Sequence, residues 1–420
     1  MVESLQKLLV PKGIRFSCSE CGNCCLHWPV PVTEGDFKKI TDALPELQPV
    51  LEHSAEESLR AEKLFKVLQV EDKKLAVFTH SLEKREDGKC AFLSSENRCI
   101  VHEKLGSEMK PSMCRLFPYT FTGTPDGVYC SISFASTATL FNQGELLDSE
   151  SEELNKKFEL FRSLFPELNL DWSQIQVIDG VPLSWSDYRK HEGSLLNKLE
   201  SIANSSVRTE KILFDEAENF RRMVPTGGNL DNLAGFEARP KLIDQVLVKE
   251  LLEFYLPDAV FQDTNFDMKA RTILGEVLQG SGKVTLSRKG VEYDFGKLFS
   301  TRLSGLSSEQ LDMVRRFVYL RVFSKLFFGP GFNYLSVISG FHHLIMLVVL
   351  ARISLKLDLL SGELSEVELA SEKGLIRLAE YLRTMERKLT VAHFSEETIA
   401  MLEVLLASPQ RMERLIGLSG

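Results

Sequence analysis

Apolar residues change their spacing about one third of the way along this chain. Before residue 147 the apolar runs are short and separated by turn residues, as in regions that mix strands with short helices. After the acidic stretch 147–153 they recur three and four residues apart over long segments, which is the helical period. The pattern predicts an α+β domain at 1–146, a mixed, mostly helical region at 147–300, and a helical bundle at 301–420.

Local signals predict individual elements on both sides of residue 147. Cys90 and Cys99 are expected on facing strands of a hairpin over 89–101, because two short apolar runs flank a polar turn there. Before residue 147, the other expected elements are helices from about 34, at 55–70 and at 111–118, and strands at 75–79 and 128–134. After it, they are helices at 183–198 and 242–255, a hairpin at 283–295, and about four helices from 308 onward.

Segment 335–357 is apolar and long enough to cross a bilayer. It carries His342, His343, Arg352 and Lys356, and its uninterrupted apolar part covers only 344–351. A membrane span needs about 20 consecutive apolar residues. We therefore expect a buried helix and no membrane span.

The composition is ordinary for a globular protein, with 44% hydrophobic and 26% charged residues over a length of 420. The net charge is −9 and the chain has no basic run, so a nucleic-acid partner is not expected. Because the first residues lack the apolar segment of a signal peptide, we expect a cytoplasmic protein. Clustered cysteines in a reducing compartment are more often metal ligands or catalytic thiols than disulfides.

All eight cysteines lie in the first third of the chain. The first four follow C-x2-C-x2-C-C spacing, and a disulfide between the two adjacent ones would be strained. The pattern predicts a metal or cluster site, with these candidate ligands: Cys18, Cys21, Cys24, Cys25, Cys90, Cys99, Cys114 and Cys130. Basic residues near the later cysteines, at Arg98, Lys110 and Arg115, can offset the thiolate charge.

Eight thiols suit several metal centres. They can hold one four-cysteine iron–sulfur cluster with the remaining thiols structural, two four-ligand sites, or one or two zinc ions. Zinc sites usually show two separated ligand pairs. The three-step run of Cys18, Cys21 and Cys24 is similar to that of ferredoxins, and it favours an iron–sulfur cluster, a 4Fe–4S cluster first, over zinc.

The order of the cysteine motifs resembles a known family. After C-x2-C-x2-C-C come Cys90-Ala-Phe-Leu, Cys99-Ile-Val-His102 and Lys110-Pro-x2-Cys114-Arg115-x-Phe117-Pro118. Over about residues 16–135 this is similar to the YkgJ-type cysteine-cluster family of zinc- or iron-chelating domains. The resemblance implies seven of the cysteines, all but Cys130, as ligands.

The same family includes the flagellin lysine N-methylase FliB, which is of similar length with a helical remainder. Residues 316–327 loosely resemble the C-terminal half of that methylase. The resemblance implies, as an alternative to a metal-binding protein without catalysis, a protein-lysine N-methyltransferase. It would use S-adenosylmethionine as methyl donor and flagellin as its protein substrate. No glycine-rich dinucleotide motif or other catalytic signature accompanies it, so catalytic residues cannot be named from the sequence.

Overall fold

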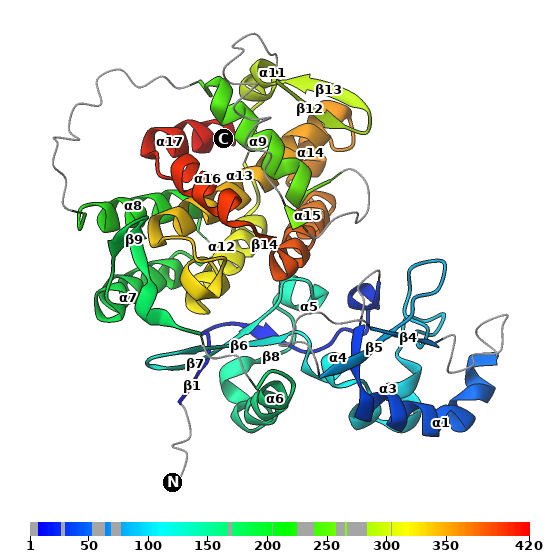
Figure 1. Cartoon of the computed structure of the whole chain (residues 1–420). Coiled ribbons are helices and arrows are strands. Elements are labelled where there is room, and N and C mark those ends of the chain that lie inside the picture. The colour runs from blue at the N-terminus through cyan, green and yellow to red at the C-terminus, as the bar shows by residue number, and fades with distance from the viewer. Residues whose placement is uncertain are drawn as a thin grey trace. The chain divides into compact units, whose positions relative to one another are not determined.

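The computed structural model divides the chain into two compact units, residues 1–169 and 170–420 (Figure 1). It describes residues 7–26, 30–52, 64–68, 77–166, 170–203, 205–224, 239–257, 265–266, 284–303 and 305–420. The first unit mixes short strands with helices and the second is mostly helical, which confirms the predicted α+β class. The proposed domain boundaries at 146 and 300 stay predictions.

Two small three-stranded sheets and one strand pair organise the first unit. One sheet has the order β1–β7–β6 and the other the order β3–β5–β4, while β2 pairs with β8. The strands are β1 (Leu8–Leu9), β2 (Arg15–Phe16), β3 (Val30–Thr33), β4 (Phe65–Val67), β5 (Phe78–Leu82), β6 (Tyr119–Thr124), β7 (Gly127–Ile132) and β8 (Glu145–Leu146). Pro125 and Asp126 form the tight turn between β6 and β7, because proline already has the backbone angle that this turn position needs. The strand predicted at 128–134 is thereby confirmed as β7.

The helices of the first unit are α1 (Glu34–Glu52), α3 (Ile100–Leu105), α4 (Ser112–Leu116), α5 (Thr137–Leu140) and α6 (Ser151–Leu164). The hydroxyl of Thr33 accepts a hydrogen bond from the Asp36 amide at 3.1 Å and so caps α1. The carboxylate of Asp36 in turn accepts one from the Ser112 amide at 2.8 Å, which ties α1 to α4. The predicted helices at these two places are confirmed.

Two predictions for the first unit need correction. Residues 55–63 of the helix expected at 55–70 lie outside the described residues, and Phe65–Val67 within it form strand β4. The β-hairpin expected over 89–101 is wrong. Isolated bridges join Leu93 to Cys99 and Lys84 to Cys90, and helix α3 begins directly after Cys99. The apolar run 99–101 serves as the buried first turn of a helix instead of a strand.

The second unit is built around one long helix, α13 (Val337–Ser361) (Figure 1). Its residues from Val337 to Asp358 are buried. It contacts other helices on several sides. A helix that is buried in this way has apolar residues on every face and not on one face alone. The other helices described in the second unit are α7 (Trp185–Ser201), α8 (Thr209–Arg221), α9 (Leu242–Tyr255), α11 (Phe295–Ser300), α12 (Ser308–Phe323), α14 (Glu366–Leu369), α15 (Glu372–Val391), α16 (Glu396–Leu406) and α17 (Pro409–Leu418). This confirms the buried helix predicted at 335–357, and within the described residues no helix meets the length and apolarity that a membrane crossing requires.

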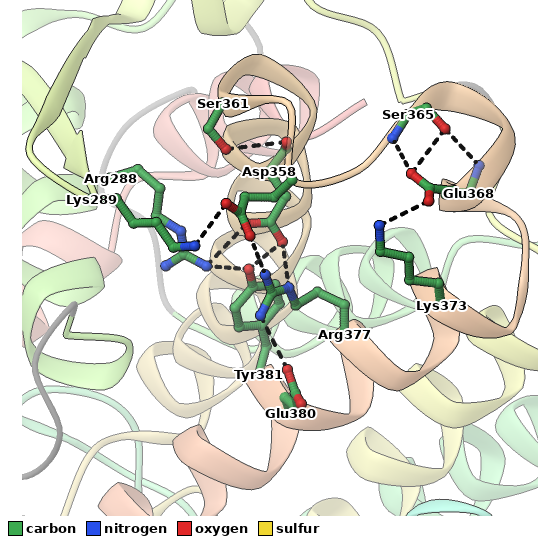
Figure 2. A network of polar contacts seen from close by, with 11 residues as sticks. Arg288, Lys289, Asp358, Ser361, Ser365, Glu368, Lys373, Arg377, Glu380 and Tyr381 are labelled. Atoms are coloured by element: carbon green, nitrogen blue, oxygen red, sulfur yellow. Dashed lines mark hydrogen bonds and ion pairs between the residues drawn. The ribbon is translucent and has the colours of Figure 1, made fainter.

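Short strands complete the second unit: β9 (Gln176–Ile178), β10 (Val181–Pro182), β11 (Asn265–Phe266), β12 (Thr285–Arg288), β13 (Val291–Asp294) and β14 (His393–Phe394). Strands β12 and β13 form the hairpin that the alternating pattern predicts. A buried polar network holds this hairpin to the helices (Figure 2). The carboxylate of Asp358 on α13 contacts Arg288 of the hairpin at 3.1 Å and Arg377 of α15 at 3.1 Å, and it accepts a hydrogen bond from the Tyr381 hydroxyl.

Candidate metal centre

The C-x2-C-x2-C-C segment is an irregular loop that ends in a 3-10 turn, Asn23–Cys25. Gly22 has a left-handed backbone, with φ at +70°, and a Cβ at this position would lie 3.0 Å from the Cβ of Asn97. Glycine is favoured here for both reasons, because it tolerates this backbone angle and has no side chain to collide. Cys18 is exposed, while the other three cysteines of the segment are partly buried.

Backbone contacts bring Cys25 and Cys90 together. The Cys90 amide donates to the Cys25 carbonyl at 3.0 Å, and the Lys84 ammonium donates to the same carbonyl at 3.1 Å. Cys99 caps α3 and bridges to Leu93, whose amide donates to the Cys90 carbonyl at 3.0 Å. Cys90 is part of the apolar core of the first unit, and Cys25 and Cys99 pack against that core.

Four thiols, Cys25, Cys90, Cys99 and Cys114, form one electrostatic group that we call the inner group. Every pair among them interacts through charge. Burial, followed by the nearby charges of Cys90 and Cys99, raises the pKa of Cys25 to about 11. Burial likewise raises the pKa of Cys90 and of Cys114. Without a cation nearby, Cys25, Cys90 and Cys114 are therefore protonated at neutral pH.

Two lysines oppose this mutual repulsion. Lys84 and Lys110 both lower the pKa of Cys25 against the stronger effects that raise it. Lys110 was expected from its position near Cys114. Lys84 is 26 residues before Lys110, and no local motif marks Lys84 as part of the site. Arg98 and Arg115 instead pair with acidic neighbours, Arg98 with Glu96 at 2.7 Å and Arg115 with Glu108 at 2.5 Å.

The remaining cysteines of the motif, Cys18, Cys21 and Cys24, form a second set that we call the outer group. A hydrogen bond from Cys24 lowers the pKa of Cys21 to about 4, and the same contact raises the pKa of Cys24. The charge of Cys18 also acts on Cys24. The Cys21 sulfur lies 3.2 Å from the hydroxyl of Thr137, a contact between residues 116 positions apart.

The adjacent residues Cys24 and Cys25 belong to different groups. Both lie in the 3-10 turn, where successive side chains project about 120° apart because the helix has about three residues per turn. Cys24 therefore contacts Cys21, while Cys25 is directed to Cys90 and its neighbours. Charge interaction between Cys24 and Cys25 themselves is the link between the two groups.

Cys130 belongs to neither group. It lies on β7 opposite Phe121, is fully buried, and its sulfur contacts the carbonyl of Ser131 at 4.0 Å. Burial alone raises its pKa, with no contribution from another cysteine. The structure therefore brings seven of the eight predicted site residues into the two groups and places the eighth in the core of a sheet.

The donor set suits a thiophilic metal centre. Among the described residues no three His, Cys, Asp or Glu side chains converge with the geometry of a bound metal ion. The inner group nevertheless offers four thiols in mutual electrostatic reach, and the thiols that burial keeps protonated would become thiolates when a cation replaces their protons. Four such thiolates are the ligand number that both zinc and iron–sulfur clusters require. Cys25, Cys90, Cys99 and Cys114 are therefore the residues that would hold the group.

Comparison with known proteins supports a metal-chelating domain in the first unit. No curated protein and no solved structure matches the chain. Residues 17–131, which contain all eight cysteines, match one family model. That model is CxxCxxCC, described as "Putative zinc- or iron-chelating domain", and residues 17–131 thus carry the domain of the YkgJ-type cysteine-cluster family.

Proposed function

We propose that this is a metal-binding protein whose inner group, Cys25, Cys90, Cys99 and Cys114, ligates an iron–sulfur cluster, with zinc as the alternative. The observation that supports it best is the electrostatic coupling of every pair among these four thiols. Thiols repel one another once ionised, so four of them in one partly buried place are stabilised by a shared cation. The donor set contains only sulfur, which is typical of zinc and iron–sulfur centres.

The choice of an iron–sulfur cluster over zinc depends on the sequence spacing and is the finer part of the proposal. When bound, such a cluster supplies electron transfer or a reactive iron, whereas a closed four-thiolate zinc site supplies stability. The chain's own contribution is the same in both cases. Lys84 and Lys110 offset part of the thiolate charge, and the apolar core beside Cys90 limits access of water.

Anaerobic purification followed by metal and sulfide analysis tests the proposal. Iron with acid-labile sulfide and a broad visible absorption band would support the cluster, and a colourless protein that holds zinc would support the alternative. A protein that retains neither metal after reconstitution under reducing conditions would contradict both.

A matched pair of variants assigns the ligands. Cys90→Ser removes one of four thiolates. If each carries about a quarter of the ~10–16 kcal/mol typical of such sites, the loss is about 3 kcal/mol, or roughly 100-fold in affinity. Cys130→Ser is the control, because it makes the same change at a buried position outside both groups. It should retain full metal content while lowering the free energy of unfolding by about 1–3 kcal/mol. Equal metal loss in both variants would refute the assignment.

We propose the methylase activity as the alternative function, and it depends on the family resemblance and the chain length. The segment 316–327 that resembles the methylase lies in α12 and the turn after it. Isothermal titration of the holo-protein with S-adenosylmethionine, and mass spectrometry of flagellin incubated with both, test it. Absence of binding and of methylated lysine would leave metal binding without catalysis. The proposed location is the cytoplasm.

A further inference from the structure

Three cationic side chains of the second unit, which we call the cationic cluster, meet at the C-terminal end of α17. Arg352 and Lys356 lie one turn apart on α13 and are 7% and 0% exposed, while Arg208, just before α8, is partly exposed. The Lys356 ammonium donates to the Leu418 carbonyl at 2.5 Å, and the Arg352 Nε donates to the Ser419 carbonyl at 3.1 Å. Arg208 donates through Nη2 to the Ser419 hydroxyl at 2.9 Å, so all three side chains reach the same helix end.

The cationic cluster has too little negative charge around it. Within the described residues, Glu210 is the one carboxylate side chain within 4 Å of the cluster, at 2.5 Å from Arg208 and 3.8 Å from Arg352. Three positive groups and one negative group leave an excess of two positive charges. The C-terminal end of a helix supplies about half a negative charge, so about 1.5 positive charges stay unbalanced. Burial, followed by the charges of Arg352 and Arg208, lowers the pKa of Lys356 to about 8.

Other buried cations of the same unit have a close carboxylate partner. Arg414 contacts Asp244 at 2.6 Å, and Lys325 contacts Glu192 at 2.9 Å. Lys356 is as buried as Lys325, yet in the part of the chain that the structure describes its ammonium contacts only carbonyl oxygens. A buried charge without a partner of opposite charge is costly, and an anion from outside would remove that cost.

The two arginines of the cluster also have N–H groups without an acceptor. Among the residues with a described position, neither Nη atom of Arg352 nor the Nη1 atom of Arg208 donates to a protein oxygen. The Nη1 atom of Arg352 lies 3.8 Å from the Glu210 carboxylate, which is beyond hydrogen-bonding distance. An acceptor that reaches both guanidinium groups would satisfy these donors.

We propose that the cationic cluster, Arg208, Arg352 and Lys356, binds a phosphate group, as free inorganic phosphate or as a small phosphate ester. The site lies in the second unit and does not depend on the proposed metal centre. A phosphate group carries about −1.5 to −2 charges at pH 7, which matches the unbalanced positive charge. Its oxygens can accept several N–H groups of two guanidinium groups at once. The partly exposed Arg208 gives access from solvent.

Isothermal titration of the purified full chain with sodium phosphate tests the proposal, with sodium chloride of equal ionic strength as the reference. We expect one phosphate per chain. Arg208→Gln should weaken binding about tenfold or more, because it removes a charge-assisted contact. Arg222→Gln makes the same change at an exposed position of the second unit and should leave the affinity unchanged. Tighter binding of glycerol 3-phosphate than of inorganic phosphate would support the site and identify an ester as its ligand.

Glu210→Gln separates binding from damage to the fold. It removes the competing carboxylate with little change of shape, so phosphate should bind several-fold tighter, a gain that a damaged fold does not produce. Circular dichroism confirms that each variant is folded. Titration heat that chloride reproduces, or an Arg208→Gln variant that binds phosphate as tightly as the unaltered chain, would overturn the site. Equal weakening in Arg208→Gln and Arg222→Gln would also overturn it, because binding would then follow overall charge alone.

Discussion

The two adjacent histidines of α13 make the second unit sensitive to mild acid. His342 is 0% and His343 is 1% exposed. Burial, with a smaller effect from Arg221, lowers the pKa of His342 to about 4, although its hydrogen bond to the Leu406 carbonyl acts in the opposite direction. Burial and the nearby Arg321 charge lower the pKa of His343 to about 3. Both rings are therefore neutral in the folded protein at pH values where they are charged in the unfolded chain.

The sign and size of this effect on stability follow from the histidine pKa of 6.5 in the unfolded chain. Between the folded and unfolded pKa the unfolded chain binds more protons, so the free energy of unfolding falls as the pH falls. The stability that the two neutral histidines contribute is fully present above pH 6.5. It is lost as the pH falls toward 4 for His342 and toward 3 for His343. From about pH 7 to about pH 5 each ring contributes a loss of ~2 kcal/mol, and the two together ~4 kcal/mol.

Urea unfolding at the two pH values measures this loss, with tryptophan fluorescence as the signal. The ring centroids of Trp172 and Trp185 lie 5.1 Å apart in the second unit, so their fluorescence reports on the unfolding of that unit. His343→Leu also removes the 2.8 Å hydrogen bond to the Tyr255 hydroxyl, so it lowers stability at both pH values. The informative quantity is therefore the difference in unfolding free energy between the two pH values. It should shrink by ~2 kcal/mol in His342→Leu and in His343→Leu. If both variants keep the full pH dependence of the unaltered chain, the assignment to these rings is refuted.

Two further predictions concern the second unit. Asp358→Ala leaves Arg288 and Arg377 without their buried carboxylate and should cost about 3–5 kcal/mol of unfolding free energy in thermal or urea melts. Its control, Glu363→Ala, removes two partly exposed ion pairs, with Lys289 and Arg377, and should cost less than about 1 kcal/mol. Gly340→Ala places a Cβ against the Phe327 carbonyl oxygen and should destabilise the protein by about 1–3 kcal/mol. Gly417→Ala meets no atom within 4 Å and should be neutral or stabilising in the same melts.

Local signals were sufficient for many elements of the fold. Helix α9 (Leu242–Tyr255) coincides with its prediction, and α7 (Trp185–Ser201) begins after Ser184, whose hydroxyl accepts a hydrogen bond from the Asp187 amide at 3.1 Å. Such caps act within one helical turn and are therefore visible in the sequence. The hairpin expected at 89–101 failed for a related reason. The three-residue apolar run 99–101 fits a strand and a helix start equally well, and only packing decides between them.

The cysteine spacing predicts which residues are candidate ligands, and that assignment stays a prediction. The matched family model supports a metal-chelating domain over residues 17–131. The spacing does not predict how the thiols are arranged. It does not indicate that Lys84 contacts the Cys25 carbonyl or that Thr137 contacts Cys21, because those contacts join residues 59 and 116 positions apart. The position of Cys130 in the cysteine-rich region predicts a ligand, and this too stays a prediction. The residue lies on β7, and burial is the cause of its raised pKa.

The adjacent pair Cys24 and Cys25 explains why a cysteine-rich loop of this kind can serve two groups at once. A 3-10 turn directs neighbouring side chains about 120° apart, so two adjacent cysteines can face two different groups of thiols. The inner group is held by the hydrogen bond from the Cys90 amide to the Cys25 carbonyl and by the apolar core that includes Cys90. The charge of Cys25 raises the pKa of Cys24, so a cation that neutralises the inner thiolates would favour ionisation of Cys24. The spacing thus couples the protonation of the outer thiols to the state of the inner group through electrostatics.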